Sequence, residues 1–126
     1  MLVSDIMRTH LRTIATDATL SDAVDVFAAS GLSALPAIDR HGRAVGICTT
    51  RDILEAEARR RDLERTLVLE FMTPWPETAR PQDDIRAVAQ RMLDGKVKRL
   101  FVEDGGALVG VVSQTDIVAA VAAARV

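Results

Sequence analysis

The feature that most constrains the fold is a phrase of eight residues that occurs twice. Gly46 to Ile53 reads GICTTRDI, and Gly110 to Ile117 reads GVVSQTDI. Each copy runs glycine, two apolar residues, a hydroxyl residue, two variable residues, aspartate and isoleucine, and the second begins 64 positions after the first (110 minus 46). Self-similarity at a fixed period indicates two copies of one supersecondary unit.

The repetition extends through most of the chain. Shifted by 65 positions, VSDIM at 3–7 meets VLEFM at 68–72, and Thr13 meets Thr78. The offset falls to 64 in one turn, where DRHG at 39–42 is matched by DGG at 104–106. A gap placed in a turn indicates a structural repeat, because loops tolerate changes of length. We expect repeats at residues 1–64 and 65–126.

Each copy is predicted to run strand, helix, strand, strand, helix. Thr19 and Asp22 have the spacing of a capping box, and Gly31 is expected to end the helix that they start. The second copy repeats this helix, with Gly95 expected to end it. The apolar residues that share one helix face are Leu20, Ala23, Val24, Phe27 and Ala28 in the first copy and Ile85, Val88, Ala89, Met92 and Leu93 in the second.

Short apolar runs between turn residues predict the strands. They lie at 12–14, 35–38 and 44–48 in the first copy and at 97–102 and 108–112 in the second, and another helix begins near Arg51. A copy of this size cannot bury enough apolar surface alone. We therefore expect an α/β protein in which two pseudo-symmetric β-α-β-β-α repeats pack sheet to sheet.

Composition excludes several classes of function. Apolar residues make up 48% of the chain, and 16 basic residues against 18 acidic ones favour neither nucleic acid nor a membrane surface as partner. The sequence shows no secretory signal and no membrane span, so we expect a cytoplasmic protein with the single cysteine, Cys48, buried in its core. Without metal-ligand spacing, a catalytic triad pattern or a glycine-rich phosphate loop, neither an enzyme nor a catalytic cofactor is expected.

The hydroxyl and the aspartate of the repeated phrase have two interpretations. Thr49 with Asp52, and Ser113 with Asp116, have capping-box spacing, so these residues could serve only to satisfy N–H groups at a helix start. Alternatively, the same helix N-termini bind a ligand. Free N–H donors and partial positive charge suit a phosphate, the hydroxyl can donate to it, and the carboxylate can accept hydrogen bonds from a ribose diol.

The order of these motifs resembles a tandem pair of cystathionine-beta-synthase (CBS) domains, a Bateman module, over nearly all of residues 2–123. The resemblance rests on VSDIM and VLEFMT, TIATDATLSDAVDVF, SALPAID and the two G-x-x-[TS]-x-x-D-I phrases. It implies a regulatory sensor that binds an adenosyl ligand, namely AMP, ADP, ATP, S-adenosylmethionine or an NAD-type molecule, in two clefts between the repeats. A structural or protein-interaction module without ligand is the alternative.

The resemblance also implies which residues line each cleft. Lys98 and Arg99 stand where basic residues contact phosphate in a nucleotide-binding member of the family, whereas their counterparts Ser33 and Ala34 are uncharged, so we expect the clefts to differ. The first cleft is expected to comprise Thr13, Leu32, Ser33, Ala34, Pro36, Val111, Ser113, Thr115 and Asp116, and the second Ile47, Thr49, Arg51, Asp52, Thr78, Val97, Lys98 and Arg99.

Surplus apolar surface on the last helix of each repeat predicts a homodimer. Ile53 and Leu54 begin one of these helices, and Ile117, Val118 and Val121 repeat the arrangement in the other. Exposed patches of this kind usually mark an interface, and the resemblance also implies pairing of modules. Because no effector domain is recognised in the sequence, a regulatory role would require an unidentified effector protein in trans.

Overall fold

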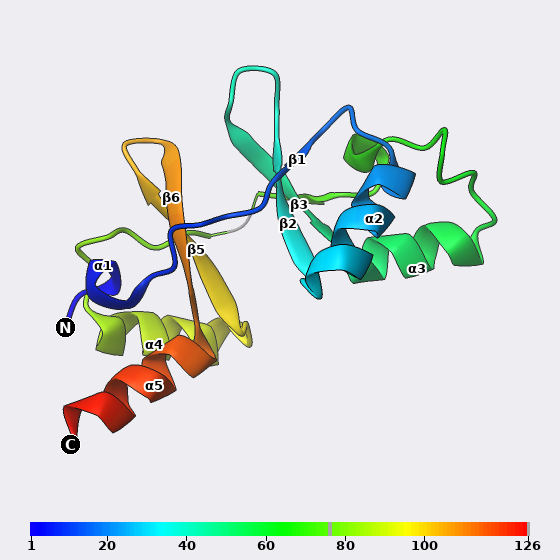
Figure 1. The fold of residues 1–126 in the computed structure, drawn as a ribbon. Coiled ribbons are helices and arrows are strands. Elements are labelled where there is room, and N and C mark those ends of the chain that lie inside the picture. Colours follow the sequence, from blue (N-terminus) through cyan, green and yellow to red (C-terminus); the bar gives the residue numbers. More distant parts are fainter. Residues whose placement is uncertain (76, 126) are drawn as a thin grey trace. The chain divides into compact units, whose positions relative to one another are not determined.

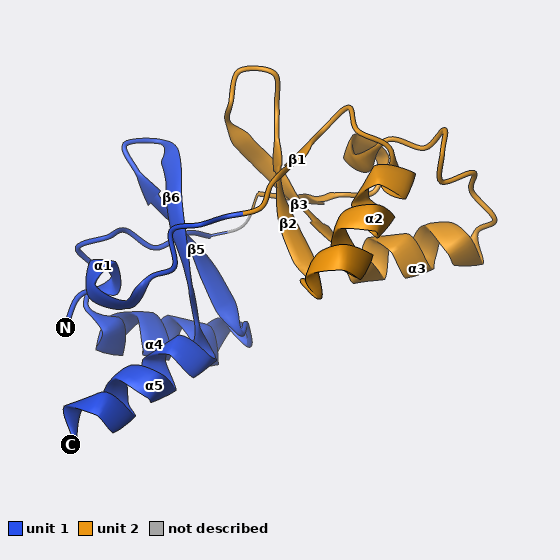
Figure 2. Ribbon diagram, viewed as in Figure 1, with its two compact units in different colours: residues 1–11, 77–126 blue, residues 12–76 orange. Residues whose placement is uncertain are grey.

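The computed structural model describes residues 1–75 and 77–125, which form two compact units (Figures 1 and 2). Unit 1 joins Met1–Leu11 to Glu77–Val126, and unit 2 is Arg12–Pro76. The opening segment of each sequence repeat therefore packs in the unit formed by the rest of the other repeat. This division follows contacts rather than sequence similarity, so the repeat boundary near residue 64 stays a prediction.

Unit 2 is built on a four-stranded sheet with the order β1-β2-β3-β4. Strand β1 runs parallel to β2, and the β2–β3 and β3–β4 pairs are antiparallel. Its elements are β1 (Ile14–Ala15), α2 (Leu20–Ser30), β2 (Ala34–Ile38), β3 (Ala44–Thr49), α3 (Thr50–Ala58), a 3-10 helix (Val68–Glu70) and β4 (Thr73–Pro74). The predicted hairpin and helices of the first repeat are thus confirmed, with bounds shifted by one or two residues.

Unit 1 repeats this arrangement with a two-stranded antiparallel sheet. Its elements are α1 (Val3–Ile6), α4 (Ile85–Gly95), β5 (Arg99–Asp104), β6 (Ala107–Ser113) and α5 (Gln114–Ala124). Single-residue bridges replace the outer strands: Arg8 pairs with Val111, and Ala79 pairs with Val102. These bridges correspond in sequence to the pairs Thr73–Ile47 and Ile14–Ala37 of unit 2.

The helix boundaries follow the sequence at the predicted positions. Thr19 and Asp22 form the predicted capping box of α2, and Gly31 ends that helix with a left-handed φ of 72°. Gly95 is the last residue of α4, as predicted, and Lys96, which follows it, takes the left-handed conformation with φ of 53°. Lys96, not Gly95, corresponds to Gly31 at the offset of 65 residues (96 minus 31).

Each unit has its own apolar core. Leu20, Ala23 and Phe27 of α2 are buried in unit 2, and Ile85, Val88 and Met92 of α4 are buried in unit 1. The last member of each predicted stripe, Ala28 and Leu93, is exposed instead. Eight positions along a helix correspond to a rotation of about 80° away from the starting residue, which carries these side chains off the buried face. No helix in the described part of the chain has both the length and the apolar character to cross a membrane.

The glycine of the repeated phrase lets another segment approach the middle of the unit. A Cβ atom added at Gly46 would lie 2.7 Å from both the carbonyl oxygen of Thr73 and the sulfur of Met72. At Gly110 it would lie 2.9 Å from the carbonyl oxygen of Arg8 and the sulfur of Met7. The phrase and the upstream methionine therefore recur together because they are in contact.

Candidate functional site

The N-terminus of α5 in unit 1 carries the hydroxyl and the aspartate of the second phrase. The Ser113 N–H donates to Asp116 Oδ2 at 2.9 Å, and the Asp116 N–H donates to Ser113 Oγ at 3.2 Å. Ser113 Oγ also lies 2.9 Å from Thr115 Oγ1, within hydrogen-bonding distance. The capping box expected from the sequence is thus formed, and three predicted site residues are brought together at one helix start.

A residue outside the predicted set completes this group. Arg8 Nε donates to Asp116 Oδ1 at 3.0 Å, and the two backbones are held close because Arg8 exchanges hydrogen bonds of 2.9 and 3.0 Å with Val111. The Asp116 side chain is 10% exposed. Burial acts to raise the pKa of Asp116, but hydrogen bonds from Ser113 and Arg8 outweigh it and hold this pKa below its usual value. Asp116 is therefore an ionised, covered carboxylate at neutral pH.

Two further basic residues lie beside the same helix start. Arg99 is the strand partner of Ser113, and the carbonyl oxygen of Lys98 accepts a hydrogen bond from the Gln114 N–H at 3.0 Å. The Gln114 side chain donates to the carbonyl oxygen of Val97 at 3.3 Å. The backbone of 97–99 is thus fixed against the N-terminus of α5, where three cationic residues of unit 1 meet the positive end of a helix dipole.

The equivalent helix start in unit 2 has the same cap and no such set of cations. The Thr49 N–H donates to Asp52 Oδ2 at 2.8 Å, and the Asp52 N–H donates to Thr49 Oγ1 at 3.3 Å. Asp52 is 5% exposed and forms no ion pair with any residue in the described ranges. Burial raises its pKa above the ordinary carboxyl value, despite the hydrogen bonds from Thr49. The two helix starts are alike in shape and opposite in the direction of their aspartate pKa shifts.

Sequence correspondence explains this difference. The unit 1 residues Arg8, Lys98 and Arg99 correspond to Thr73, Ser33 and Ala34 of unit 2 at the offset of 65 residues (73 minus 8, 98 minus 33, 99 minus 34). In unit 2, the carbonyl oxygen of Ser33 accepts from the Thr50 N–H at 3.1 Å and Ala34 pairs with Thr49, so the backbone arrangement is the same. At these three positions unit 1 has basic side chains and unit 2 has uncharged ones. The reverse holds at one position, where unit 2 has Arg51 and unit 1 has Thr115.

The other predicted site residues lie on the strands and just outside them. Pro36 is fully buried in β2, while Ile47 and Val111 are half-buried in β3 and β6. Leu32 and Val97 are exposed just before β2 and β5. Thr13 precedes β1, and Thr78 accepts a hydrogen bond from Arg91 through its carbonyl oxygen at 2.7 Å. Each predicted cleft draws residues from both units, so the closing of these sets onto common clefts stays a prediction.

Arg8 was missed because sequence reasoning looked only at the repeated phrase and its flanking strands. A usable signal was present: Arg8 directly follows VSDIM, and Thr73 directly follows the matching VLEFM. Comparison of the residues after these two segments shows one charged and one neutral position. Only the structure shows that Arg8 pairs with Val111 of the repeated phrase, which brings its charge next to Asp116.

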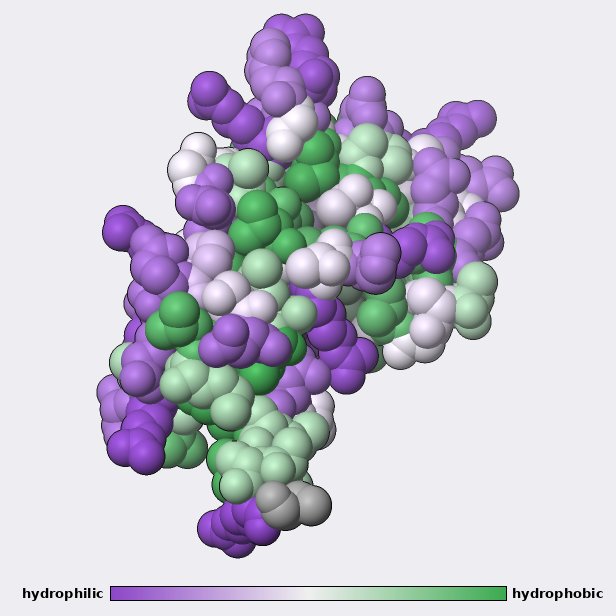
Figure 3. Space-filling model, turned by 60° about the vertical axis from the view of Figure 1, so that its left-hand side comes forward, coloured by the Kyte–Doolittle hydropathy of each residue, from purple (hydrophilic) through white to green (hydrophobic). Residues whose placement is uncertain are grey.

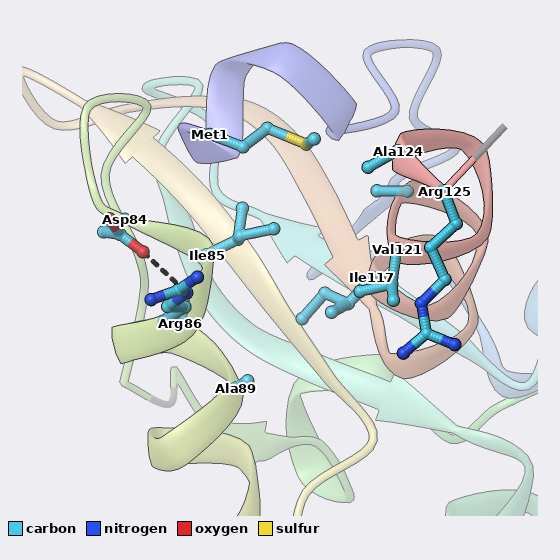
Figure 4. A pocket seen from close by; sticks show the side chains of 10 residues that line it. Met1, Asp84, Ile85, Arg86, Ala89, Ile117, Val121, Ala124 and Arg125 are labelled. Atoms are coloured by element: carbon cyan, nitrogen blue, oxygen red, sulfur yellow. Dashed lines mark hydrogen bonds between the residues drawn. The ribbon is translucent and has the colours of Figure 1, made fainter.

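Unit 1 also carries an apolar groove between α4 and α5, of about 540 Å³ (Figure 4). Its walls include Ile85 and Ala89 from α4 and Ile117 and Val121 from α5, with Met1 at one end. Figure 3 shows a pale green, weakly apolar surface at the lower end of the face in view. Val118 on α5 is 67% exposed. The groove is therefore an uncovered apolar face.

The single cysteine of the chain, Cys48, lies in the core of unit 2. Burial, followed by the nearby charge of Asp52, raises the pKa of Cys48 to about 12, so this buried thiol stays protonated at neutral pH. Within residues 1–75 and 77–125, no three histidine, cysteine, aspartate or glutamate side chains are grouped so that they could hold a metal ion.

The model of the CBS domain family matches residues 3–59 and 68–123, and the chain therefore belongs to the CBS domain family. Among curated relatives, the CBS domain-containing protein YhcV of Bacillus subtilis is 29% identical over 116 residues, which cover 91% of this chain and 81% of that protein. Protein MJ1225 of Methanocaldococcus jannaschii is 25% identical over 92% of this chain and 41% of its own length. This chain also spans only 24% of protein MJ1404 of the same organism.

Solved CBS domain pairs have the same fold. The CBS domain pair of protein MJ0100, in complex with 5′-methylthioadenosine and S-adenosyl-L-methionine, is 27% identical with a TM-score of 0.82, and 98% of each chain is covered. A putative acetoin utilization protein of Vibrio cholerae is 26% identical with a TM-score of 0.87, and the match covers 99% of this chain and 93% of that one. The α/β fold of a tandem CBS protein is thereby established.

Proposed function

We propose that this CBS domain pair is a non-catalytic regulatory module that binds an adenosine-containing ligand. The N-terminus of α5 takes the polar part of that ligand. The hydroxyl groups of Ser113 and Thr115 contact phosphate or sugar, and Asp116 accepts hydrogen bonds from the ribose diol. We also propose that the other residues predicted from the sequence to line the two clefts contact the ligand.

The observation that carries the proposal is the Arg8–Asp116 ion pair at a capped helix start, beside the backbone of Lys98 and Arg99. A cap alone needs a hydroxyl and a carboxylate, and the equivalent start in unit 2 is capped without these three basic residues. A helix N-terminus is a ready site for an anion because its N–H groups point outward and its dipole is positive there. Added basic side chains strengthen the same preference.

The similarity to the CBS domain pair of MJ0100 supports the adenosyl part of the proposal. That pair was solved with two adenosyl compounds, and it is similar to this chain over nearly the full length of both. A ligand regulates only if it binds two states of the protein with different affinity. The proposed response is therefore a change in shape or in affinity for an effector protein in trans.

A second candidate function is a structural or protein-interaction module that holds no ligand. It is favoured by the completed capping boxes, because Thr49, Asp52, Ser113 and Asp116 all have partners within their own helix starts. On this account the repeated phrase only stabilises two helices, and the basic residues of unit 1 hold no ligand.

A thermal-shift screen separates the two candidates. The purified chain is heated with AMP, ADP, ATP, S-adenosylmethionine, methylthioadenosine and NADH, with guanosine and cytidine nucleotides as controls. One ligand at 100 times its Kd adds about 2.7 kcal/mol to the unfolding free energy, which is a shift of several degrees for a chain of this size. A rise restricted to adenosine compounds is expected. No shift with any of them, confirmed by calorimetry at millimolar ligand, leaves the interaction module as the function.

A further inference from the structure

We propose that Arg8 is a gate that sets the ligand specificity of the unit 1 site. In the unliganded chain its guanidinium covers the Asp116 carboxylate, and it moves to the phosphate of an arriving ligand when the ribose takes its place. The site then admits adenosyl ligands that carry a phosphate in preference to those that lack one. This inference rests on the proposed function and assigns a role to a residue outside the predicted set.

The geometry shows that the carboxylate is occupied. Asp116 Oδ2 accepts the Ser113 N–H, and Asp116 Oδ1 accepts Arg8 Nε at 3.0 Å. The Asp116 side chain is 10% exposed, so the carboxylate is largely hidden from solvent. The side chain of Arg8 contacts it and covers part of it. A ribose diol needs acceptor oxygens that it can reach. Each carboxylate oxygen keeps a second lone pair, but the Arg8 side chain lies against Oδ1, so in the proposed gate it withdraws to make room for the diol.

The structure also shows that Arg8 can withdraw without unfolding anything. Its backbone is fixed by two hydrogen bonds to Val111, whereas its side chain is 71% exposed and makes one described side-chain contact, the bond from Nε to Asp116. Rotation about side-chain bonds moves the guanidinium while its Cα stays beside β6. A guanidinium has five N–H donors in a planar fork, which suits two oxygens of one phosphate.

The exchange favours phosphorylated ligands because of what each ligand returns to Arg8. A ligand without phosphate takes Asp116 and leaves Arg8 with water alone. A ligand with phosphate gives Arg8 a new bidentate partner that is negatively charged, like the lost carboxylate. Ligand specificity is the difference between the affinities for two ligands. Loss of the Arg8–Asp116 ion pair weakens the binding of a ligand without phosphate, whereas the new contact between Arg8 and phosphate compensates for this loss in a phosphorylated ligand.

Unit 2 contains the same machinery without the gate. Thr73 occupies the place of Arg8, pairing with Ile47 as Arg8 pairs with Val111, and Asp52 has its cap partner and no ion pair in the described part of the chain. Because Thr73 cannot form an ion pair, it should give the helix start of unit 2 no preference for phosphorylated ligands. Replacement of Thr73 by arginine would transfer the gate to it.

The test compares adenosine with AMP as probes of known structure that differ by one phosphate. Binding is followed by NMR through the amide signals of 113–116 for unit 1 and 49–52 for unit 2, so that the two helix starts are measured separately. The variants are Arg8→Met, Thr73→Arg and the charge-matched control Arg65→Met, whose arginine is 89% exposed and lies in unit 2. Circular dichroism confirms that each variant is folded.

In the wild type we expect AMP to bind the unit 1 site at least about tenfold more tightly than adenosine, the scale of one hydrogen bond to a charged group. Arg8→Met should weaken AMP and strengthen adenosine at 113–116, so that the ratio falls toward one, and Arg65→Met should leave the ratio unchanged. Thr73→Arg should create a similar preference at 49–52.

The outcomes separate the gate from the proposed function. If both ligands bind and Arg8→Met leaves their affinity ratio unchanged, the gate is wrong while the proposed function stands. If the wild type binds neither ligand but Arg8→Met binds adenosine, Arg8 blocks the site without opening for a phosphate, so the proposed gate is wrong while ligand binding at this site stands. If neither protein binds either ligand at millimolar concentration, both the gate and ligand binding at this site are wrong.

Discussion

Lys96 in unit 1 takes the left-handed backbone conformation that Gly31 takes in unit 2, with φ of 53° against 72°. Both residues follow the first long helix of their repeat, and each N–H donates to a helix carbonyl oxygen, from Gly31 to Phe27 and from Lys96 to Leu93. A glycine adopts this conformation at no steric cost, whereas a side chain makes it unfavourable. The same structural position is thus filled by an unstrained glycine in unit 2 and by a strained lysine in unit 1.

Lys96→Gly is therefore expected to stabilise unit 1. The gain should be about 1 kcal/mol in the unfolding free energy, because the steric cost of a left-handed lysine is removed while the helix-end hydrogen bonds remain. Urea unfolding followed by circular dichroism measures it. Gly31→Ala is the matched control and should destabilise by about the same amount, since only open space lies within 4 Å of the added Cβ and the cost is purely that of the backbone. A loss of stability in Lys96→Gly would contradict this account.

The close approach at the phrase glycines predicts a large effect from one methyl group. Gly46→Ala should destabilise by about 1–3 kcal/mol, because the new Cβ would meet the backbone oxygen of Thr73, which cannot move without disturbing β4. Gly110→Ala should do the same against Arg8. The midpoints of urea denaturation give both values. Gly95→Ala is the control: Gly95 is helical and an added Cβ would lie 4.0 Å from its nearest neighbours, the methyl groups of Val97, so this change should be neutral or stabilising.

Asp116→Asn distinguishes a ribose acceptor from a simple cap. If Asp116 holds ribose, ligand affinity should fall by about 1.5–3 kcal/mol, the scale of a hydrogen bond to a charged group, in addition to the loss of unliganded stability that comes from the cap and the Arg8 ion pair. Calorimetry with the ligand found in the screen and urea unfolding without it give the two quantities. A loss of about 0.5–2 kcal/mol in stability alone would instead identify a cap. Asp52→Asn should differ from it, because unit 2 lacks the three cations.

The two aspartates predict opposite dependences of stability on pH. The pKa of Asp116 is lowered on folding, so its stabilising contribution is present above the ordinary value of 3.8 and is lost as pH falls through the lowered pKa. The pKa of Asp52 is raised on folding, so its contribution declines as pH rises from 3.8 through the raised pKa. Urea midpoints between pH 3 and 7 should therefore show that Asp52→Asn gains stability relative to wild type as pH rises, while Asp116→Asn loses it. Parallel curves for both variants would refute this assignment.

We expect the chain to form a homodimer through the apolar faces of its last helices. Every described residue of α5 is at least partly exposed, and Val118 and its counterpart Leu54 on α3 are 67% and 71% exposed. An uncovered apolar face of this kind is commonly an interface between copies. Light scattering at micromolar concentration should give twice the mass of one chain, and Val118→Lys should reduce the measured mass to that of a single chain. Leu69→Lys, at an exposed leucine of the 3-10 helix, should leave the dimer intact. A monomeric wild type would be the contrary result.

Local patterns predicted the elements because their causes are local. Thr19 with Asp22, and Ser113 with Asp116, specify helix starts through side chains three positions apart, and the structure contains both caps. The predicted end of α4 at Gly95 is also confirmed, although the left-handed residue is the next one, Lys96. Glycine is the usual left-handed residue, and Gly95 stands next to the lysine that takes the position.

The candidate site was harder to predict because it joins residues that are distant in sequence. Arg8 and Asp116 are 108 positions apart, and neither periodicity nor capping chemistry connects them. Their contact follows from the bridge between Arg8 and Val111, which in turn needs the glycine at 110. A sequence read one repeat at a time assigns Arg8 to the first repeat, whereas the structure places it in the unit that contains the second phrase.

The exchange of opening segments between the repeats also sets an order of assembly. Unit 2 is one continuous stretch of sequence, whereas unit 1 must bring the two ends of the chain together. Val3 packs in the same core as Val112, which follows it by 109 positions (112 minus 3). Contacts between such distant residues form late because a long loop has to close first. During vectorial synthesis unit 2 is complete as soon as its last strand emerges, and its folding shortens the loop that the waiting N-terminal segment has to cross.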